Sequence, residues 1–148
     1  MKIRKFKKND YSTILDIYSK SKLDELLYES KSFTFLPLDK DKKRLAEFQE
    51  SEIYVYEDNG VMAYGAVFNS EIRAIFVHPN GRRKGVGRKL FKHLLSKIEG
   101  ESSLYVAKSN MPAKKLYEQF GFSVVDEFET TYNGITVTAN KMIRHTSA

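Results

Sequence analysis

Two glycines flanked by basic side chains form the part of the sequence with the clearest chemical potential. Residues 77–88 read Val-His-Pro-Asn-Gly-Arg-Arg-Lys-Gly-Val-Gly-Arg and lead into a segment with helical spacing of apolar residues. Glycine lets the backbone approach a ligand closely, and the first turn of a helix presents N–H groups that lack partners within the helix. These donors and the helix dipole both favour an anion. The segment therefore predicts a phosphate or pyrophosphate site between Arg82 and Arg88.

Spacing distinguishes this loop from two other nucleotide-binding patterns. A Walker A loop needs a second glycine five positions after the first, but Val86 stands five positions after Gly81. A dinucleotide-binding fingerprint needs glycine or alanine three residues after Gly87, where the sequence has leucine. The pattern that does fit is Arg82-x-x-Gly85-x-Gly87, which follows a predicted strand and a proline. By itself this pattern is also compatible with a simple helix cap.

A second group of residues lies on a short predicted helix that begins near Asn110. Residues three, four and seven positions apart share one face of a helix, so Asn110 and Tyr117 are expected to face the same cleft. Pro112 in the first turn and Gly121 after the last turn are typical of helix ends. The alternative is that Tyr117 is a core aromatic residue at helical spacing.

The order of elements that must position these residues predicts an α/β protein. Apolar spacing and turn signals indicate strands over 2–6, 53–56, 61–68, 71–77, 104–106, 122–132 and 135–143, and helices near 11–18, 42–50, 86–98 and 113–120. Asn133-Gly134 is a strong hairpin signal. The strand–helix–strand run over 71–107 predicts two parallel neighbouring strands. We therefore expect a mixed sheet of six or seven strands with helices on both faces and a C-terminal β-hairpin.

These two patterns together resemble a known family. Residues 75–90 look like the Arg/Gln-x-x-Gly-x-Gly/Ala signature of GNAT superfamily N-acetyltransferases, and residues 110–122 are similar to the family pattern Asn-x-x-Ala-x-x-x-Tyr-x-x-x-Gly-Phe. The resemblance implies one GNAT-like domain over residues 1–148, with acetyl-CoA as the acetyl donor. The cofactor-binding residues that it implies are Ile75, Phe76, Val77, Arg82, Arg83, Lys84, Gly85, Val86, Gly87, Arg88, Asn110 and Tyr117.

The resemblance also implies catalytic roles. Tyr117 would protonate the departing CoA thiolate, and Glu71 resembles the glutamate that many family members use as a general base, often through water. Strand alternation predicts that Glu71 shares one face with Arg73, Ile75 and Val77. The alternative is that Glu71 is a solvated residue after a turn. Some relatives place the base five residues before the asparagine, but Tyr105 stands there.

Transfer to an amine needs a neutral nitrogen, because a free amine is protonated at pH 7. Backbone N–H groups of residues 75–77 would meet the oxyanion if that strand splays from residues 104–106. The sequence has no cysteine and no Gly-x-Ser-x-Gly elbow, which favours direct attack in a ternary complex over an acyl-enzyme. The resemblance places the acceptor pocket near Tyr28, Phe33 and Phe35. Polyamines, amino acids, aminoglycosides and protein N-termini all remain open as acceptors.

Composition narrows the partners further. The chain of 148 residues has 25 Lys and Arg against 19 Asp and Glu, which gives a net charge of +6 and favours anionic partners. Without cysteine there are no disulfides and no cysteine zinc sites, and we expect no metal. No apolar run has the length of a membrane span, so we expect a cytoplasmic protein without a membrane partner. Two other functions remain as alternatives: a non-catalytic acetyl-CoA sensor and a basic nucleic-acid-binding domain. A homodimer is compatible with the sequence.

Overall fold

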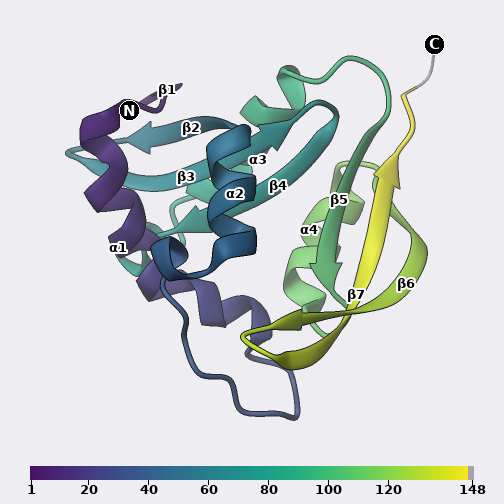
Figure 1. The fold of residues 1–148 in the computed structure, drawn as a ribbon. Coiled ribbons are helices and arrows are strands. Elements are labelled where there is room, and N and C mark those ends of the chain that lie inside the picture. Colours follow the sequence, from purple (N-terminus) through teal and green to yellow (C-terminus); the bar gives the residue numbers. More distant parts are fainter. Residues whose placement is uncertain (147–148) are drawn as a thin grey trace.

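A seven-stranded mixed sheet runs through the molecule in the order β1-β2-β3-β4-β5-β7-β6 (Figure 1). The computed structural model describes residues 1–146. The strands are β1 (Lys2–Lys5), β2 (Glu52–Glu57), β3 (Val61–Phe68), β4 (Glu71–Val77), β5 (Ser102–Ala107), β6 (Ser123–Tyr132) and β7 (Ile135–Arg144). All neighbouring strands are antiparallel except β4 and β5. The parallel pair, the seven strands and the C-terminal hairpin confirm the predicted α/β architecture.

Helices cover both faces of this sheet, as predicted. On one face lie α1 (Tyr11–Ser21), which continues into the 3₁₀ segment η2 (Lys22–Leu26), and α2 (Lys42–Glu50). On the other lie α3 (Val86–Ser96) and α4 (Met111–Gln119), which Figure 1 draws behind the strands. Each face has its own apolar core, one around Leu90 and Phe91 of α3 and one around Ile14 and Ile17 of α1. Ile98 packs into the first core although α3 ends at Ser96. No helix within residues 1–146 is long and apolar enough to span a bilayer.

Strands β4 and β5 diverge soon after they meet. They pair at only two positions, Glu71 with Ser103 and Ile72 with Leu104, whereas β4 continues to Val77 beside β3. The expected splay is therefore present. Because N–H groups alternate in direction along an antiparallel pair, some of those between residues 73 and 77 point away from β3 into the gap.

A β-bulge in β4 changes which side chains share a face. Ile72 of β4 pairs with Val67 of β3, and Ala74 pairs with Ala66, the residue before Val67. Arg73 therefore has no partner in β3 and is an extra residue. An extra residue in one strand reverses the alternation of side chains beyond it.

This bulge overturns the expectation that Glu71 and Arg73 lie on the same face as Ile75 and Val77. Ile75 and Val77 pack against the α3 core together with Ile72. Arg73 instead binds the C-terminal end of α2, and Glu71 lines a hollow with residues of α2. The acidic residue is thus presented on the face of α1 and α2, opposite α3.

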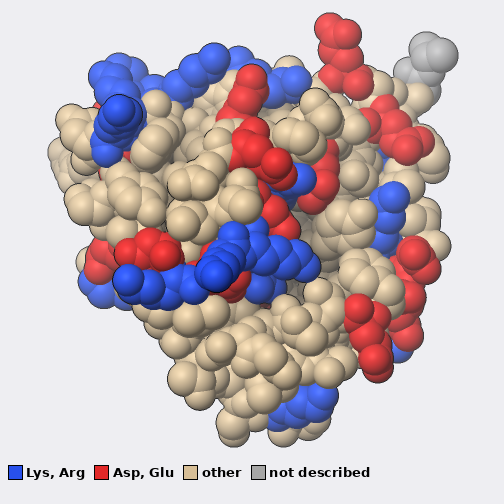
Figure 2. Space-filling model, viewed as in Figure 1, with Lys and Arg blue, Asp and Glu red and all other residues tan. Residues whose placement is uncertain are grey.

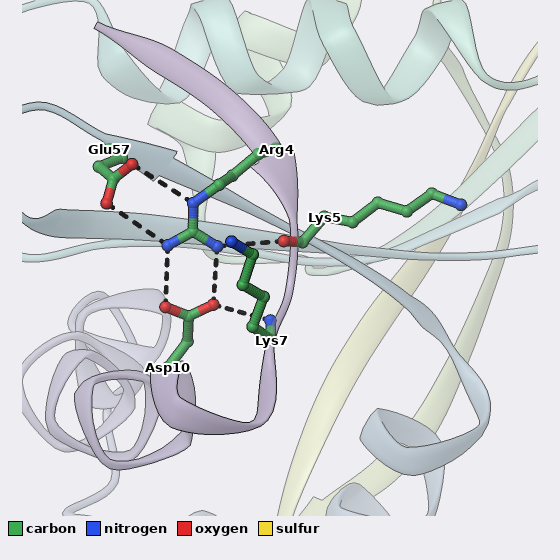
Figure 3. Close-up of polar contacts among 5 residues, drawn as sticks. All are labelled: Arg4, Lys5, Lys7, Asp10 and Glu57. Carbon is green, nitrogen blue, oxygen red and sulfur yellow. Dashed lines mark hydrogen bonds and ion pairs between the residues drawn. The ribbon is translucent and has the colours of Figure 1, made fainter.

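The start of α1 is fixed by a charged network around Arg4 of β1 (Figure 3). The guanidinium donates to both carboxylate oxygens of Asp10, at 2.8 and 2.9 Å, and to Glu57 of β2 at 3.3 and 3.4 Å. Asp10 is buried and also accepts from the backbone N–H of Lys7 at 2.8 Å. Bidentate charged hydrogen bonds of this kind have a defined geometry. The network therefore sets where α1 leaves the sheet, and with it the position of η2 over the gap between β4 and β5.

Candidate functional site

A cleft of about 820 Å³ opens where β4 and β5 diverge. Its walls come from α1 and η2, β4, the loop before α3, β5 and the start of α4. Eight of the residues predicted from the sequence line it together, namely Tyr28, Ile75, Phe76, Val77, Arg82, Arg83, Asn110 and Tyr117. Segments distant in the sequence therefore converge at one cleft, as the two motifs predicted.

The glycine-rich loop ends in an open helix N-terminus. Gly85 is the N-cap of α3 with a φ of 73°, in the left-handed region that favours glycine, and no side chain caps the helix. A Cβ added to Gly85 would meet no atom within 4 Å, so the space in front of the helix is free of protein atoms there. Arg83 also has a positive φ, 64°, which is uncommon for a residue with a side chain. The backbone amides at the start of α3 are thus available to an anion.

The residues around this helix start have different surroundings. Val86 is buried in the core and anchors the first turn, while Gly87 lies close to β4, with room for a Cβ 3.6 Å from Val77. Lys84 is exposed, whereas Arg88 donates to Gln119 of α4 at 2.6 Å. Arg88 therefore links α3 to α4.

Arg82, at the edge of the cleft, forms an ion pair with Asp24 of η2. Ser109, before α4, is hydrogen-bonded to Glu29. Two contacts therefore hold the segment after α1 across the cleft mouth.

On the α4 side, Asn110 and Tyr117 take the positions expected from helical spacing. Asn110 is the N-cap of α4, and its side-chain oxygen accepts from the N–H of Ala113 at 3.4 Å. Tyr117 packs against Phe91, with ring centroids 5.0 Å apart, and still lines the cleft. Burial raises the pKa of Tyr117 to about 12. Its hydroxyl therefore stays protonated at neutral pH, and it is a weaker acid than the hydroxyl of a free tyrosine.

Glu71 lies in a second hollow of about 430 Å³ on the α2 side of the sheet. This hollow shares wall residues of β4 and β5 with the cleft, including Arg73 and Tyr105, so the two adjoin. The Glu71 side chain is 28% exposed, and its carboxylate is 3.6 Å from Nε of Arg73. Burial raises the pKa of Glu71 above its ordinary value, although the charge of Arg73 opposes the shift. A carboxylate with a raised pKa is a stronger base than a free one.

Two of the residues predicted to bind the acceptor do not line either hollow. Phe33 packs against Tyr132, with centroids 6.4 Å apart, and Phe35 packs against Tyr18, with centroids 6.0 Å apart. Both phenylalanines pack against buried apolar clusters, and of the three predicted residues only Tyr28 lines the cleft.

Three residues that sequence reasoning missed line the cleft: Tyr18, Lys22 and Glu47. Tyr18 and Lys22 are four residues apart, a spacing that places both on one face of a helix, and no sequence signal marked Glu47.

Charge of both signs gathers on the face of α1 and α2 (Figure 2). Around the second hollow, Lys22 is paired with Glu25, Arg44 with Asp41, and Arg73 with Glu50. Within residues 1–146, no group of three or more His, Asp or Glu side chains has the arrangement of a metal site.

Comparison with known proteins agrees with this geometry. The family model described as the acetyltransferase (GNAT) domain matches residues 49–124. The chain is 28% identical over 138 residues to NAA20, the catalytic subunit of the N-terminal acetyltransferase B complex of Arabidopsis thaliana, covering 89% of this chain and 78% of that protein. It is 28% identical over 103 residues to the human cysteine-rich protein 2-binding protein, covering 62% of this chain and 13% of that much longer relative.

A solved structure shows the same fold. The protein yncA of Salmonella typhimurium, determined with its cofactor acetyl-CoA, superimposes with a TM-score of 0.70 at 20% identity, over 100% of this chain and 95% of that one. The family match covers half of the sequence and includes both motifs, β4, α3 and α4. The chain therefore belongs to the GNAT acetyltransferase family.

Proposed function

We propose that this protein transfers an acetyl group from acetyl-CoA to a primary amine by direct attack in a ternary complex. The observation that carries the proposal is the divergence of β4 from β5, because the cleft and the second hollow adjoin there. Arg82 and Arg83, in the loop that leads into α3, line the cleft together with Tyr117, and Glu71 lines the second hollow. The similarity to NAA20, an N-terminal acetyltransferase, supports nitrogen as the atom that is acetylated.

The chain's own groups fit the cofactor. Amides between Arg83 and Arg88 would hold the diphosphate of CoA, because the α3 N-terminus is uncapped and Gly85 leaves the space before it open. Arg82 and Lys84 add positive charge, and Asn110 and Tyr117 border the same cleft. Bound acetyl-CoA supplies an activated acetyl thioester.

Three groups of the protein would then act on the reaction. Glu71 accepts a proton from the acceptor ammonium, directly or through water, which leaves a neutral nitrogen to form the new C–N bond. N–H groups of residues 75–77 that face the gap stabilise the negative charge that develops on the carbonyl oxygen. As the C–S bond breaks, Tyr117 donates its proton to the sulfur, and the second proton, which the nitrogen loses as it becomes an amide, restores the Tyr117 hydroxyl through water. The sequence has no cysteine that could carry the acetyl group, and these steps need no acyl-enzyme.

We also propose that residues 1–148 work as a single domain. The sheet that forms the site takes its first strand from Lys2 and its last from Arg144, so both ends of the described chain contribute to one layer. The acceptor side of the site depends on β6 and β7 as well as on the N-terminal helices.

A screen of amines for CoA release tests the proposal. We expect at least one amine to release CoA from acetyl-CoA in the presence of the protein. If acetyl-CoA binds but no amine in a broad library releases CoA, the non-catalytic sensor is the better description. Binding of nucleic acid that falls steeply with salt, without binding of CoA, would favour the third alternative.

A further inference from the structure

The hollow that contains Glu71 has hydrogen-bond donors near one end and carboxylates at the other. Its volume of about 430 Å³ suits a small molecule or the end of a chain. The hollow adjoins the cleft at one end, where Tyr18 of α1 lines the cleft and Lys22 of η2 lines both, and its other end is formed by α2 and β4. The groups at each end indicate what an acceptor must carry.

At the first end, the hydroxyl of Tyr18 has no hydrogen-bond partner. Tyr18 is 2% exposed, and its hydroxyl is one of two buried side-chain polar atoms without a partner within residues 1–146. Burial raises the pKa of Tyr18, so the group remains a donor. It is subject to the charges of Arg44 and Glu25, which line the hollow. Buried polar groups are nearly always paired, so this hydroxyl points to a ligand atom that accepts a hydrogen bond.

Lys22 places a fixed cation beside this hydroxyl. Its side chain is 7% exposed, and Nζ is 3.0 Å from the carboxylate of Glu25. Nζ also lies 5.8, 5.7 and 5.3 Å from the ring centroids of Tyr18, Phe76 and Tyr132. The three rings and the carboxylate therefore surround the end of the Lys22 side chain and hold it in place. An ammonium has three donors, so Lys22 can donate to a ligand oxygen while it keeps its bond to Glu25.

At the other end, Glu47 provides a carboxylate beside Glu71. Glu47 lines both hollows, and within residues 1–146 its carboxylate makes no hydrogen bond or ion pair. Its charge contributes to the raised pKa of Glu71, so the two carboxylates are close enough to repel each other. Arg73 is 2.5 Å from Glu50 and 3.6 Å from Glu71, so it offsets part of this repulsion. A bound ammonium would relieve this repulsion.

We propose that the acceptor is a primary amine that also carries a carboxylate or carbonyl oxygen, as in an amino acid or a peptide N-terminus. Its ammonium binds Glu47 and Glu71, and its oxygen binds the Tyr18 hydroxyl and the Lys22 ammonium. This inference rests on the proposed function. It disfavours polyamines, which have no such oxygen, and it gives Tyr18, Lys22 and Glu47 roles in choosing the substrate.

An exposed aromatic pair at the hollow favours an acceptor with an apolar or aromatic side chain. Tyr105 and Phe128 are 49% and 37% exposed, with ring centroids 5.5 Å apart, and both line the hollow. They form an apolar edge next to the two charged ends. Probes with a phenyl group are therefore suitable for testing the site.

Titration of CoA-loaded protein by NMR with four probes of matched body tests the proposal. The probes are phenylalanine, phenylalanine amide, 2-phenylethylamine and 3-phenylpropanoate. We expect the first two to bind roughly tenfold or more tightly than 2-phenylethylamine, since only they satisfy both ends. Stronger binding of phenylalanine than of its amide would identify free amino acids as the source, and the reverse would identify peptides. Equal affinity for phenylalanine and 2-phenylethylamine, or no saturation by any probe, would overturn the proposal.

Variants assign the two ends separately. Tyr18→Phe should remove most of the advantage of phenylalanine and its amide, leave 2-phenylethylamine unchanged and cause no loss of thermal stability, because the hydroxyl has no partner to lose. Tyr56→Phe, in the core under α3, is the matched control and should change none of these affinities. If Tyr18→Phe leaves the advantage intact, the hydroxyl does not bind the acceptor.

At the other end, Glu47→Gln should weaken all three amines and spare 3-phenylpropanoate. The matched control is Glu99→Gln, at an exposed position after α3 that lines neither hollow, and it should alter no affinity. Equal effects of the two substitutions would contradict the role of Glu47. Calorimetry with CoA on the same samples keeps this inference apart from the proposed function. Protein that binds CoA but none of the amines refutes the acceptor site alone.

Discussion

At the scale of single residues, burial raises the pKa of both side chains that are proposed to move protons. Tyr117 is packed against Phe91 and keeps its proton to high pH, since burial raises its pKa to about 12. Glu71 is half-buried, and its raised pKa makes it a better base than a solvated carboxylate. The two groups border adjoining hollows on either side of the gap between β4 and β5.

Replacing Tyr117 with phenylalanine should slow turnover without affecting cofactor binding. Loss of a general acid typically costs roughly a hundredfold or more in rate. We expect kcat to fall by about that factor, while the affinity for CoA measured by calorimetry stays within about twofold. Unchanged kcat would show that Tyr117 is only a core aromatic residue. Tyr56→Phe serves as the control.

The pH dependence of activity should reveal Glu71. Because its pKa is raised, the carboxylate is protonated and inactive as a base over a wider acid range than a free glutamate. We expect kcat/KM to rise with pH through an apparent pKa above the ordinary glutamate value, and Glu71→Gln to remove this rise and lower kcat. A Glu71→Gln enzyme with the same pH profile as the original protein would exclude Glu71 as the base.

The residues found from sequence and those missed differ in a physical way. Asn110 and Tyr117 lie on one helix, where spacing alone fixes a common face. The face of Glu71 was predicted wrongly because the extra residue Arg73 reverses the alternation, and nothing local in the sequence marks that bulge. Tyr18 and Glu47 come from two different helices, so only tertiary packing brings them to one hollow.

At the scale of elements, the site depends on strands that part and on helices that start in the right place. The sequence predicted the strand, loop and helix around residues 71–96 because apolar periodicity and glycines are local signals. It also predicted the parallel pairing of β4 and β5. The direction in which α1 crosses the sheet is set by the Arg4 network, which joins residues up to 53 positions apart. Such pairing has no signature in a single sequence.

Asp10→Asn tests how strongly this network holds α1. The pKa of Asp10 is lowered, mainly by its hydrogen bonds to Arg4. Its contribution to stability is therefore complete above the unfolded pKa of about 4 and is lost as pH falls toward the lower folded value. We expect Asp10→Asn to reduce the free energy of unfolding at neutral pH by roughly 2 kcal/mol and to weaken the acid dependence below about pH 4. Denaturant titration of both proteins at pH 3 and pH 7 measures this.

The exposed turn residue Asp58 provides the control for this test. Asp58→Asn should change stability little at either pH, because no side-chain contact of Asp58 within residues 1–146 would be lost. A stability loss in Asp10→Asn that is equal at pH 3 and pH 7 would contradict the account.

At the scale of the whole molecule, the proposed ternary complex places the two substrates on either side of the gap between β4 and β5. The proposed cofactor side includes the loop before α3 and the start of α4, and the proposed acceptor side includes η2, α2 and the C-terminal hairpin. In this proposal the two substrates meet at the unpaired part of β4. This arrangement allows direct transfer without a covalent carrier on the protein.

The central claim is that backbone amides at the start of α3 hold the diphosphate of CoA. Calorimetric titration of the intact protein with CoA, acetyl-CoA and pantetheine, which lacks the diphosphate, tests it most directly. We predict saturable binding of CoA and acetyl-CoA with one site per chain, and affinity for pantetheine lower by at least about tenfold. Absence of saturable heat with both CoA and acetyl-CoA, or pantetheine binding as tightly as CoA, would contradict the claim.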